Sequence, residues 1–275
     1  MPRRARPAPD RHVLYQRAVQ APEVEVDFVN TVFRKLTGRR PARLREDFCG
    51  TAAIACEWVK RRRTNIAVGV DLHQDTLDWG RLHNIAKLHP EARGCVELLC
   101  RNVVRPGPRG VGMDVVMAMN FSYWVFKERG RLLEYFRSVR RSLVRDGVFV
   151  LDIYGGPDAM DQVHERRPIG RGGGKGPGGF TYIWDQKKFD PITNETRCHI
   201  HFRMNNGMSI RKAFTYDWRV WTIPEVRDIL ADAGFKKSTV YWEGDDGKGG
   251  GNGIFRAAKH GECCAAFIAY IAAER

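Results

Sequence analysis

The sequence of 275 residues lacks any apolar run of about 18 residues, the length that a membrane-spanning helix needs. Its opening stretch, MPRRARPAPDRH, is basic and proline-rich but has no apolar segment behind it, so we expect neither a membrane anchor nor a secretory signal. Hydrophobic residues make up 43% of the chain, which is typical of globular proteins with a sizeable core. These absences favour a soluble protein.

Cys-x-x-Cys motifs are also missing, because none of the seven cysteines is followed by another at that spacing. This scatter predicts reduced thiols and a cytoplasmic location rather than a disulfide framework or a zinc knuckle. His199 and His201 in CHIHF alternate onto one face of a predicted strand, but no third ligand lies nearby in the sequence. We therefore expect no metal site.

Acidic residues are outnumbered by basic ones, with 32 Asp and Glu against 46 Lys and Arg and a formal net charge of +14. Such an excess favours polyanions but identifies no specific partner. Much of it lies in the runs RRAR, KRRR and RSVRRSLVR, which are also typical of solvated protein surfaces. RNA is therefore kept as a possible partner beside the simpler interpretation of charged, solvated faces.

In place of internal repeats, the sequence has an alternation of strand and helix patterns. Residues 22–37 have apolar residues at helical spacing and precede a glycine, which predicts an amphipathic helix. Five strands are then predicted in ARLRED, NIAVGVDL, CVELLCRNV, GMDVVMAMNFSYWVF and GVFVLDIY, with helical segments between them. The segment NIAVGVDL is apolar on both faces, as a central parallel strand is. The alternation predicts an α/β fold, a doubly wound parallel sheet that binds ligands at the carboxyl ends of its strands.

The alternation stops after the fifth strand. Residues 155–179 are rich in Gly and Pro and predict a flexible loop. The segments FTYIWDQKKF, TRCHIHFRMN and MSIRKAFTYDW follow, joined by turn sequences, and predict a three-stranded antiparallel insertion. TIPEVRDILADAGF is then a helix with Thr222 as N-cap and Gly234 at its end, followed by strands in KSTVYWEG and CCAAFIAYIAA.

This organisation predicts four parts. We expect a loose N-terminal arm over residues 1–21, a ligand-binding core over 22–154, a Gly-rich loop and β insertion over 155–221 that serves as a substrate lid, and a C-terminal helix with the closing strands over 222–275.

The segment LREDFCGTAAIACEW contains a turn between a strand and a helix, yet the Gly-x-Gly-x-x-Gly motif of a dinucleotide site is missing. Phe48 and Ala52 stand where glycines would be expected, and an acid, Glu46, comes just ahead of the turn. That acid would repel phosphates but suits a ligand with an ammonium and a sulfonium charge. Asp71, at the end of the second strand, has the position of an acid that binds ribose hydroxyls.

With these features the chain resembles the class I S-adenosylmethionine-dependent methyltransferases. EDFCGTA is similar to their first motif, GVDL to the second and DVVMAMNFSYWVF to the motif of the fourth strand. The resemblance covers about residues 40–155, and the segment 222–273 is similar to the tail of the family. It implies a seven-stranded sheet whose last strand is antiparallel, with the β insertion after the fifth strand, and S-adenosylmethionine as cofactor.

The resemblance also implies roles for individual residues. Glu46 would lie near the methionine end of the cofactor, Asp71 would hold the ribose, Leu72 would pack beside the adenine, and Asn102 would meet the adenine edge. The full set of implied cofactor-binding residues is Glu46, Cys49, Gly50, Thr51, Asp71, Leu72, Asn102, Asn120 and Phe121.

The acceptor side is less defined by the sequence. Candidate substrate-binding residues are Trp124, Tyr154, Tyr182 and Arg203, among the aromatic and basic side chains of the insertion and its flanks. The segment after Asn120 lacks the two prolines of the adenine-specific DNA methyltransferases, which disfavours methylation of a flipped base. No catalytic base is assigned, since methyl transfer to a neutral amine by direct in-line displacement needs mainly alignment and desolvation.

Several functions remain open at this point. The favoured one is methyl transfer to a small molecule held under the β insertion, and the rival among enzymes is methylation of RNA or a protein. A catalytically silent scaffold is an alternative, because the altered glycine turn is what a lost cofactor site would look like. A nicotinamide-dependent oxidoreductase is disfavoured by the missing glycines.

Overall fold

The computed structural model describes residues 9–170, 178–247 and 250–275. The described residues form two compact units. The core unit consists of residues 22–160 and 219–275, and the insertion unit consists of residues 9–21 and 161–218. Each unit has its own sheet and is described by itself.

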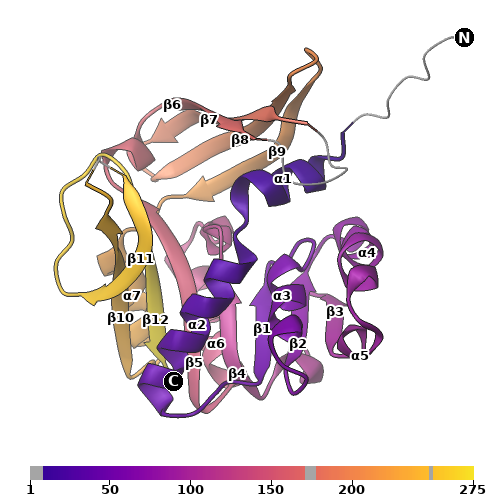
Figure 1. Ribbon diagram of the computed structural model, residues 1–275. Helices are drawn as coiled ribbons and strands as arrows, with labels where there is room; N and C mark the ends of the chain where they lie inside the picture. Colours follow the sequence, from indigo (N-terminus) through magenta and orange to yellow (C-terminus); the bar gives the residue numbers. More distant parts are fainter. Residues whose placement is uncertain (1–8, 171–177, 248–249) are drawn as a thin grey trace, which may run out of the picture. The chain divides into compact units, whose positions relative to one another are not determined.

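The core unit is built on an eight-stranded sheet in the order β11-β10-β12-β5-β4-β1-β2-β3 (Figure 1). Its strands are β1 (Arg43–Asp47), β2 (Ile66–Asp71), β3 (Val96–Cys100), β4 (Met113–Ala118), β5 (Leu143–Gly155), β10 (Lys237–Asp245), β11 (Gly251–Ala258) and β12 (Phe267–Glu274). Strands β1 to β5 are parallel, and β12 lies antiparallel between β5 and β10. The predicted α/β fold with an antiparallel last strand is therefore confirmed.

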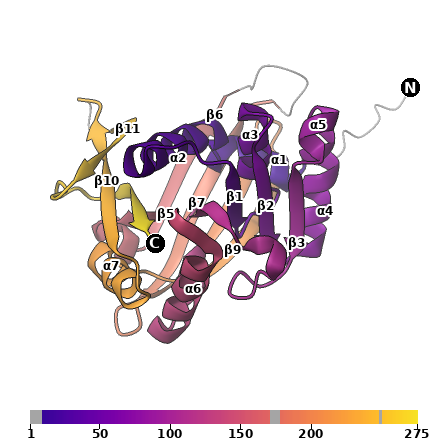
Figure 2. The same ribbon diagram turned by 90° about the horizontal axis from the view of Figure 1, so that it is seen from below.

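Helices cover both faces of this sheet. They are α2 (Pro22–Thr37), α3 (Ala53–Arg61), α4 (Gln74–His83), α5 (Pro90–Arg93), α6 (Arg129–Ser142) and α7 (Ile223–Asp232). Short 3-10 turns lie at Ile85–Lys87, Pro108–Gly110, Ser122–Val125 and Pro157–Met160. Helices α2 and α3 lie on one face, and α6 and α7 lie on the other (Figure 2). This is the doubly wound arrangement that the alternation of strands and helices predicts.

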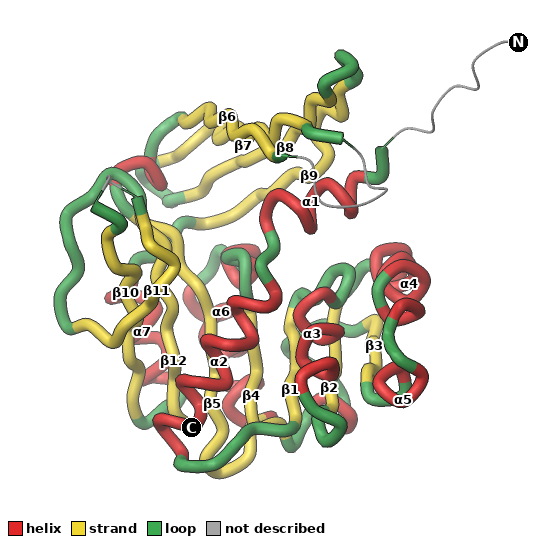
Figure 3. The backbone as a smooth tube through the Cα atoms, in the orientation of Figure 1, coloured by secondary structure: helices red, strands yellow, loops and turns green. Residues whose placement is uncertain are grey.

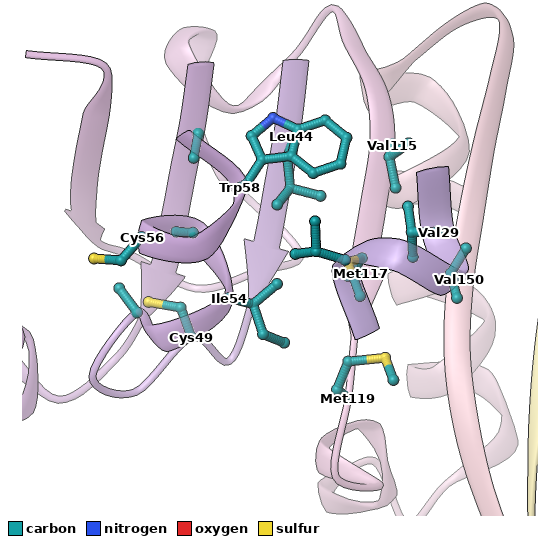
Figure 4. Close-up of a cluster of buried hydrophobic side chains, with 14 of the residues drawn as sticks. Val29, Leu44, Cys49, Ile54, Cys56, Trp58, Val115, Met117, Met119 and Val150 are labelled. Carbon is teal, nitrogen blue, oxygen red and sulfur yellow. The ribbon is translucent and has the colours of Figure 1, made fainter. Parts of the chain in front are cut away.

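Apolar side chains fill the space between the sheet and helices α2 and α3. Val29 of α2 and Trp58 of α3 pack with Leu44, Met117 and Val150 of the sheet (Figure 4). All six residues of β4 are buried, as expected for a strand covered by helices on both faces. Helices α2 and α3 are thereby packed against β1, β4 and β5.

The opposite face has an aromatic core with a buried ion pair at its edge. Tyr135 and Phe149 pack edge to face with ring centroids 6.1 Å apart. Arg45 and Asp47 of β1 are both fully buried and bind through Arg45 Nε and Asp47 Oδ1 at 2.8 Å. The Tyr135 hydroxyl donates to Asp47 Oδ2 at 2.8 Å. A buried charge pair of this kind is tolerated because both partners are hydrogen-bonded.

The insertion unit has a four-stranded antiparallel sheet and one helix (Figure 3). The elements are α1 (Arg11–Val19), β6 (Val163–Ile169), β7 (Phe180–Asp190), β8 (Glu195–Met204) and β9 (Ser209–Arg219), with strand order β6-β7-β8-β9. Leu14 and Ala18 of α1 pack against one face of the sheet in a cluster with Ile200 and Phe202. The unit therefore has a small core of its own.

Four details differ from the sequence predictions. Residues 11–19, predicted as part of a loose arm, form α1, whose N-cap Asp10 accepts a hydrogen bond from the backbone of His12. Residues 163–169, predicted as loop, form β6, so the insertion has four strands instead of three. Strand β11 adds an eighth strand to the core sheet, and Cys263 and Cys264 precede β12 instead of lying in it. Residues 1–8 of the arm and 171–177 of the loop lie outside the described residues.

Candidate functional site

The turn between β1 and α3 contains three residues in the left-handed region of backbone conformation. These are Phe48 with φ of 55°, Gly50 with φ of 51° and Ala52 with φ of 59°. Left-handed conformations are costly for residues with a side chain, so the surroundings have to hold them. The Phe48 ring packs against Phe126 and Tyr135, with centroids 6.1 and 5.6 Å apart. Aromatic packing thus stabilises the left-handed conformation of Phe48.

The backbone amides of this turn are used inside the protein. The Cys49 amide donates to the Val70 carbonyl at 3.1 Å, and the Ala52 amide donates to the Cys49 carbonyl at 2.8 Å. The Gly50 amide donates to Asp71 Oδ2 at 2.8 Å. A dinucleotide site requires such amides to face a pyrophosphate. Their engagement here disfavours a dinucleotide and agrees with the missing glycine motif.

Helix α4 supports the turn from outside, a contact that the sequence analysis missed. A Cβ atom at Gly80 would lie only 2.7 Å from the Thr51 carbonyl oxygen. The Asn84 side chain donates from Nδ2 to the same oxygen at 2.8 Å. Gly80 therefore allows the helix to touch the turn, and a glycine inside the helical pattern DWGRL was the available signal.

Asp71 ends β2 and joins two backbone segments. Besides Gly50, its carboxylate accepts the His73 amide at Oδ1, at 2.9 Å. A carboxylate has about four acceptor positions, so capacity remains for a ligand hydroxyl. The neighbouring Leu72 is 64% exposed. Asn102 is also exposed, and its Oδ1 accepts the Val104 amide at 2.9 Å.

Glu46 is buried at the carboxyl end of β1. Its Oε2 accepts the Ala55 amide in the first turn of α3 at 2.8 Å. Burial raises the pKa of Glu46 to about 8, and the charges of Glu25 and Asp71 add to this effect while hydrogen bonds from the Ala55 and Ile54 amides oppose it. An acid predicted from the sequence as a cofactor residue thus also fixes the start of α3.

A second turn follows β4. Asn120 and Phe121 are both left-handed, with φ of 57° and 54°. Their amides donate to the two carboxylate oxygens of Asp152 on β5, at 2.7 and 2.9 Å. Burial raises the pKa of Asp152 to about 7 although both amide bonds lower it. The sequence analysis missed Asp152; the signal was an acid in the last part of an apolar strand, close to the position that Asp71 has in β2.

Glu25 of α2 is a further acid that the sequence analysis missed. It is 6% exposed, and its Oε2 is buried without a hydrogen-bond partner among the residues that the structure describes. Burial raises its pKa to about 8, with added contributions from the charges of Asp152 and Glu23. Glu25 occupies the apolar face of α2 together with Val26 and Val29, and an acid at that helical spacing was the signal.

Two of the predicted substrate residues form an aromatic group in the core unit. The rings of Trp124 and Tyr154 lie 5.5 and 5.8 Å from that of Phe121, and 6.4 Å from each other. Trp124 is buried, whereas Tyr154 is half-buried. This group adjoins the turn that Asp152 holds.

The other two predicted substrate residues belong to the insertion unit. Tyr182 is buried in its core, packs against Phe202 and lies under the Arg167 guanidinium, 5.2 Å from the ring centroid. Arg203 is exposed on β8. Their role toward a substrate stays a prediction.

The two histidines of CHIHF are engaged in hydrogen bonds within the insertion unit. His199 Nδ1 bonds the Thr215 hydroxyl at 2.9 Å, and His201 bonds Asp185 Oδ2 through Nε2 at 3.2 Å. The Lys212 amide donates to His201 Nδ1 at 3.0 Å. Within residues 9–170, 178–247 and 250–275, no group of three or more His, Cys, Asp or Glu side chains could hold a metal ion. In the same part of the chain, no helix has both the length and the apolarity that a membrane crossing requires.

Comparisons with known proteins identify the fold. No protein-family model matches the chain, and no curated protein sequence matches it significantly. Several solved structures match over nearly its whole length. One is the amino pentose methyltransferase CalS10 from Micromonospora echinaspora, solved with S-adenosylmethionine bound, with 17% identity over 96% of this chain and 95% of that one and a TM-score of 0.68.

Two further solved structures that match over most of the chain are also methyltransferases. The sugar N-methyltransferase KedS8 from a Streptoalloteichus species is 16% identical over 96% of this chain and 92% of that one, with a TM-score of 0.65. The structure of CcbJ methyltransferase from Streptomyces caelestis is 15% identical over 93% of this chain and 91% of that one, with a TM-score of 0.64. The chain therefore has the fold of the class I S-adenosylmethionine-dependent methyltransferases.

Proposed function

We propose that the protein binds S-adenosylmethionine and transfers its methyl group to an amine of a small molecule. The observation that carries this proposal is a set of four acids on a methyltransferase fold. Glu46 and Asp71 lie at the carboxyl ends of β1 and β2, and Asp152 lies in the carboxyl-terminal part of β5. Glu25 of α2 lies near Glu46 and Asp152. Ligands of open α/β sheets bind at this edge, and carboxyl groups that ionise there favour a cation over a phosphate.

The residues present fit the proposed cofactor. In the described part of the chain the buried Glu25 Oε2 has no hydrogen-bond partner, so this site can accept a positively charged group. When bound, S-adenosylmethionine would supply an electrophilic methyl group on a positively charged sulfonium. Asp71 would accept the ribose hydroxyls, the exposed Leu72 would pack beside the adenine, and Asn102 would meet the adenine edge.

The turns would position the remainder of the ligand. Cys49, Gly50 and Thr51 would line the methionine end with backbone groups, and Glu46 would hold the start of α3 against that turn. The turn at Asn120 and Phe121 would line the methyl group. Because the acceptor nitrogen is neutral, the chain needs to align it and exclude water, and the proton of the product ammonium passes to solvent.

A small amine is favoured as acceptor for two reasons. The aromatic group of Phe121, Trp124 and Tyr154 adjoins the proposed methyl site, and aromatic side chains commonly line pockets for small ligands. The matched structures include an amino pentose methyltransferase and a sugar N-methyltransferase. For the insertion unit taken by itself, we propose that Tyr182 and Arg203 can bind an acceptor.

RNA is the second candidate acceptor, because the net charge of +14 favours a polyanion. Binding to RNA through basic side chains would fall steeply as salt concentration rises. Binding of a small amine would change little over the same range, since it releases few counterions. A salt titration of binding therefore distinguishes the two acceptors.

Calorimetric titration with S-adenosylmethionine tests the cofactor assignment. The wild-type protein should bind, and Asp71→Ala should lose at least tenfold in affinity because the ribose acceptor is removed. Asp75→Ala is the matched control, since Asp75 is an exposed acid in the first turn of α4 and should leave affinity unchanged. Circular dichroism should show that all three proteins are folded. Failure of the folded wild type to bind would contradict the proposal and favour the scaffold alternative.

Transfer of a labelled methyl group tests the acceptor. Amino sugars, their hydroxyl analogues and total RNA would be incubated with the protein in parallel. Label in the amino sugars but not in the hydroxyl analogues would support an amine acceptor. Label only in RNA would overturn the small-molecule proposal.

A further inference from the structure

We propose that Glu25 is a proton-linked counter-ion for the methyl donor: its side chain is uncharged in the ligand-free protein and releases a proton to solvent when the sulfonium cation binds. This inference rests on the proposed function and assigns to α2 a role in distinguishing the charged donor from its demethylated product.

The position of Glu25 in the fold is the first support. Helix α2 packs against α3, which follows β1, and against β5, which carries Asp152. Glu25 lies on the buried side of this helix between apolar residues of the core, and only 6% of it is exposed. A side chain so placed reaches neither bulk water nor a basic partner in the described structure.

The second support is the unsatisfied oxygen. Buried polar atoms in native proteins almost always have a hydrogen-bond partner, and a buried carboxylate without one is especially costly. Glu25 Oε2 has none among the described residues. Glu46 and Asp152, in contrast, accept backbone amides. Of these three buried acids, Glu25 is the one whose oxygen is left for a ligand.

The third support is the charge around Glu25. The groups that face it are acids or a phenol: Asp152 from β5, Glu23 from its own helix, Glu46 from β1 and Tyr270 from β12. Burial together with Asp152 and Glu23 raises the pKa of Glu25 to about 8. The proton therefore stays on Glu25 at neutral pH until a positive charge makes ionisation favourable.

The chemistry of methyl transfer gives this proton a function. The donor carries a positive sulfonium, whereas the demethylated product carries a neutral thioether. An ionised Glu25 attracts the donor but gains nothing from the product sulfur. After transfer, the side chain takes up a proton again, which weakens retention of the product relative to the donor.

Calorimetry in buffers of different ionisation enthalpy measures the protons released on binding. At pH 7 the wild type should release about one proton more with the donor than Glu25→Gln does. The demethylated product should release less than the donor, and the difference between wild type and variant should nearly vanish with the product. Asp27→Asn is the control, because Asp27 is an exposed acid of the same helix and should release as many protons as the wild type.

A second measurement needs no variant of Glu25. Release of one proton makes affinity rise about tenfold per pH unit below the pKa of the free group. The ratio of donor affinity to product affinity in the wild type should therefore rise between pH 6 and pH 8 and then level off. A flat ratio, or equal proton release by wild type and Glu25→Gln, would overturn the inference although the donor binds. Absence of donor binding to the wild type would overturn the proposed function as well.

Discussion

Replacing Gly80 by alanine should disturb the turn that the proposed cofactor site is built on. Gly80 is an interior residue of α4, and its Cα faces the backbone of the turn after β1. An added Cβ would lie 2.7 Å from the Thr51 oxygen, 3.0 Å from its carbonyl carbon and 3.2 Å from its Cα. These atoms belong to the backbone, so either the turn or the helix has to move.

The expected magnitude follows from two opposing terms. Alanine is about 1 kcal/mol better than glycine inside a helix. Overpacking of a close contact costs about 1–3 kcal/mol, and the steric contact here is with rigid backbone, so the upper part of this range applies. The Gly80→Ala protein should therefore be about 1–2 kcal/mol less stable than wild type. It should also bind S-adenosylmethionine at least several-fold more weakly.

Thermal unfolding and calorimetric titration measure both effects. A loss of 1 kcal/mol corresponds to a fall in Tm of about 2–4 °C for a protein of this size. Gly130→Ala is the matched control, because Gly130 is also helical and an added Cβ there meets no atom within 4 Å. That variant should be unchanged or slightly more stable. If Gly80→Ala were as stable as Gly130→Ala and bound the cofactor normally, the supporting role of α4 would be refuted.

Three further predictions concern stability. Asp47→Ala should cost about 3–5 kcal/mol in urea unfolding, because it leaves the buried Arg45 without its carboxylate; an effect under 1 kcal/mol would contradict this. Thr222→Ala should cost about 1 kcal/mol, because Thr222 and Glu225 form a capping box at the start of α7, and an unchanged Tm would show that the cap contributes little. The folded protein holds the proton of Glu25 more tightly than the unfolded chain, so this residue lowers stability as pH rises from about 4.5 to about 8. Glu25→Gln should therefore be more stable than wild type by at least ~1 kcal/mol at pH 8.5 and similar to it at pH 4.5, and parallel Tm curves of the two proteins would argue against a raised pKa.

The sequence predicts the central architecture because strands buried on both faces have a simple pattern. Residues 66–70 of NIAVGVDL are all apolar, and residues 67–70 are buried in β2. Asp71 is the last residue of this strand, so its place at the carboxyl edge of the sheet could be expected before the structure was known. The same reasoning applies to Glu46.

Edge strands could not be found this way. β6 (Val163–Ile169) and β11 (Gly251–Ala258) are mostly exposed and contain charged or glycine residues, so neither has the alternation of a half-buried strand. Each is a strand because its backbone pairs with a neighbour, β7 or β10. Charged, irregular sequences are common at the edges of sheets, where they prevent further pairing.

The sequence by itself determined the alternating strands and helices and the acids that end β1 and β2, because burial and strand ends leave local patterns. Only the tertiary structure decided which groups the acids contact, and it added Asp152 and Glu25 to the acids of β1 and β2. Asp152 of β5 holds the turn at Asn120 and Phe121, which follows β4 and lies about 30 positions earlier in the sequence. The charge of Asp152 on β5 raises the pKa of Glu25, and Glu25 also interacts with the charge of Glu46 on β1. Such contacts depend on distances across the fold, which no local pattern of residues encodes.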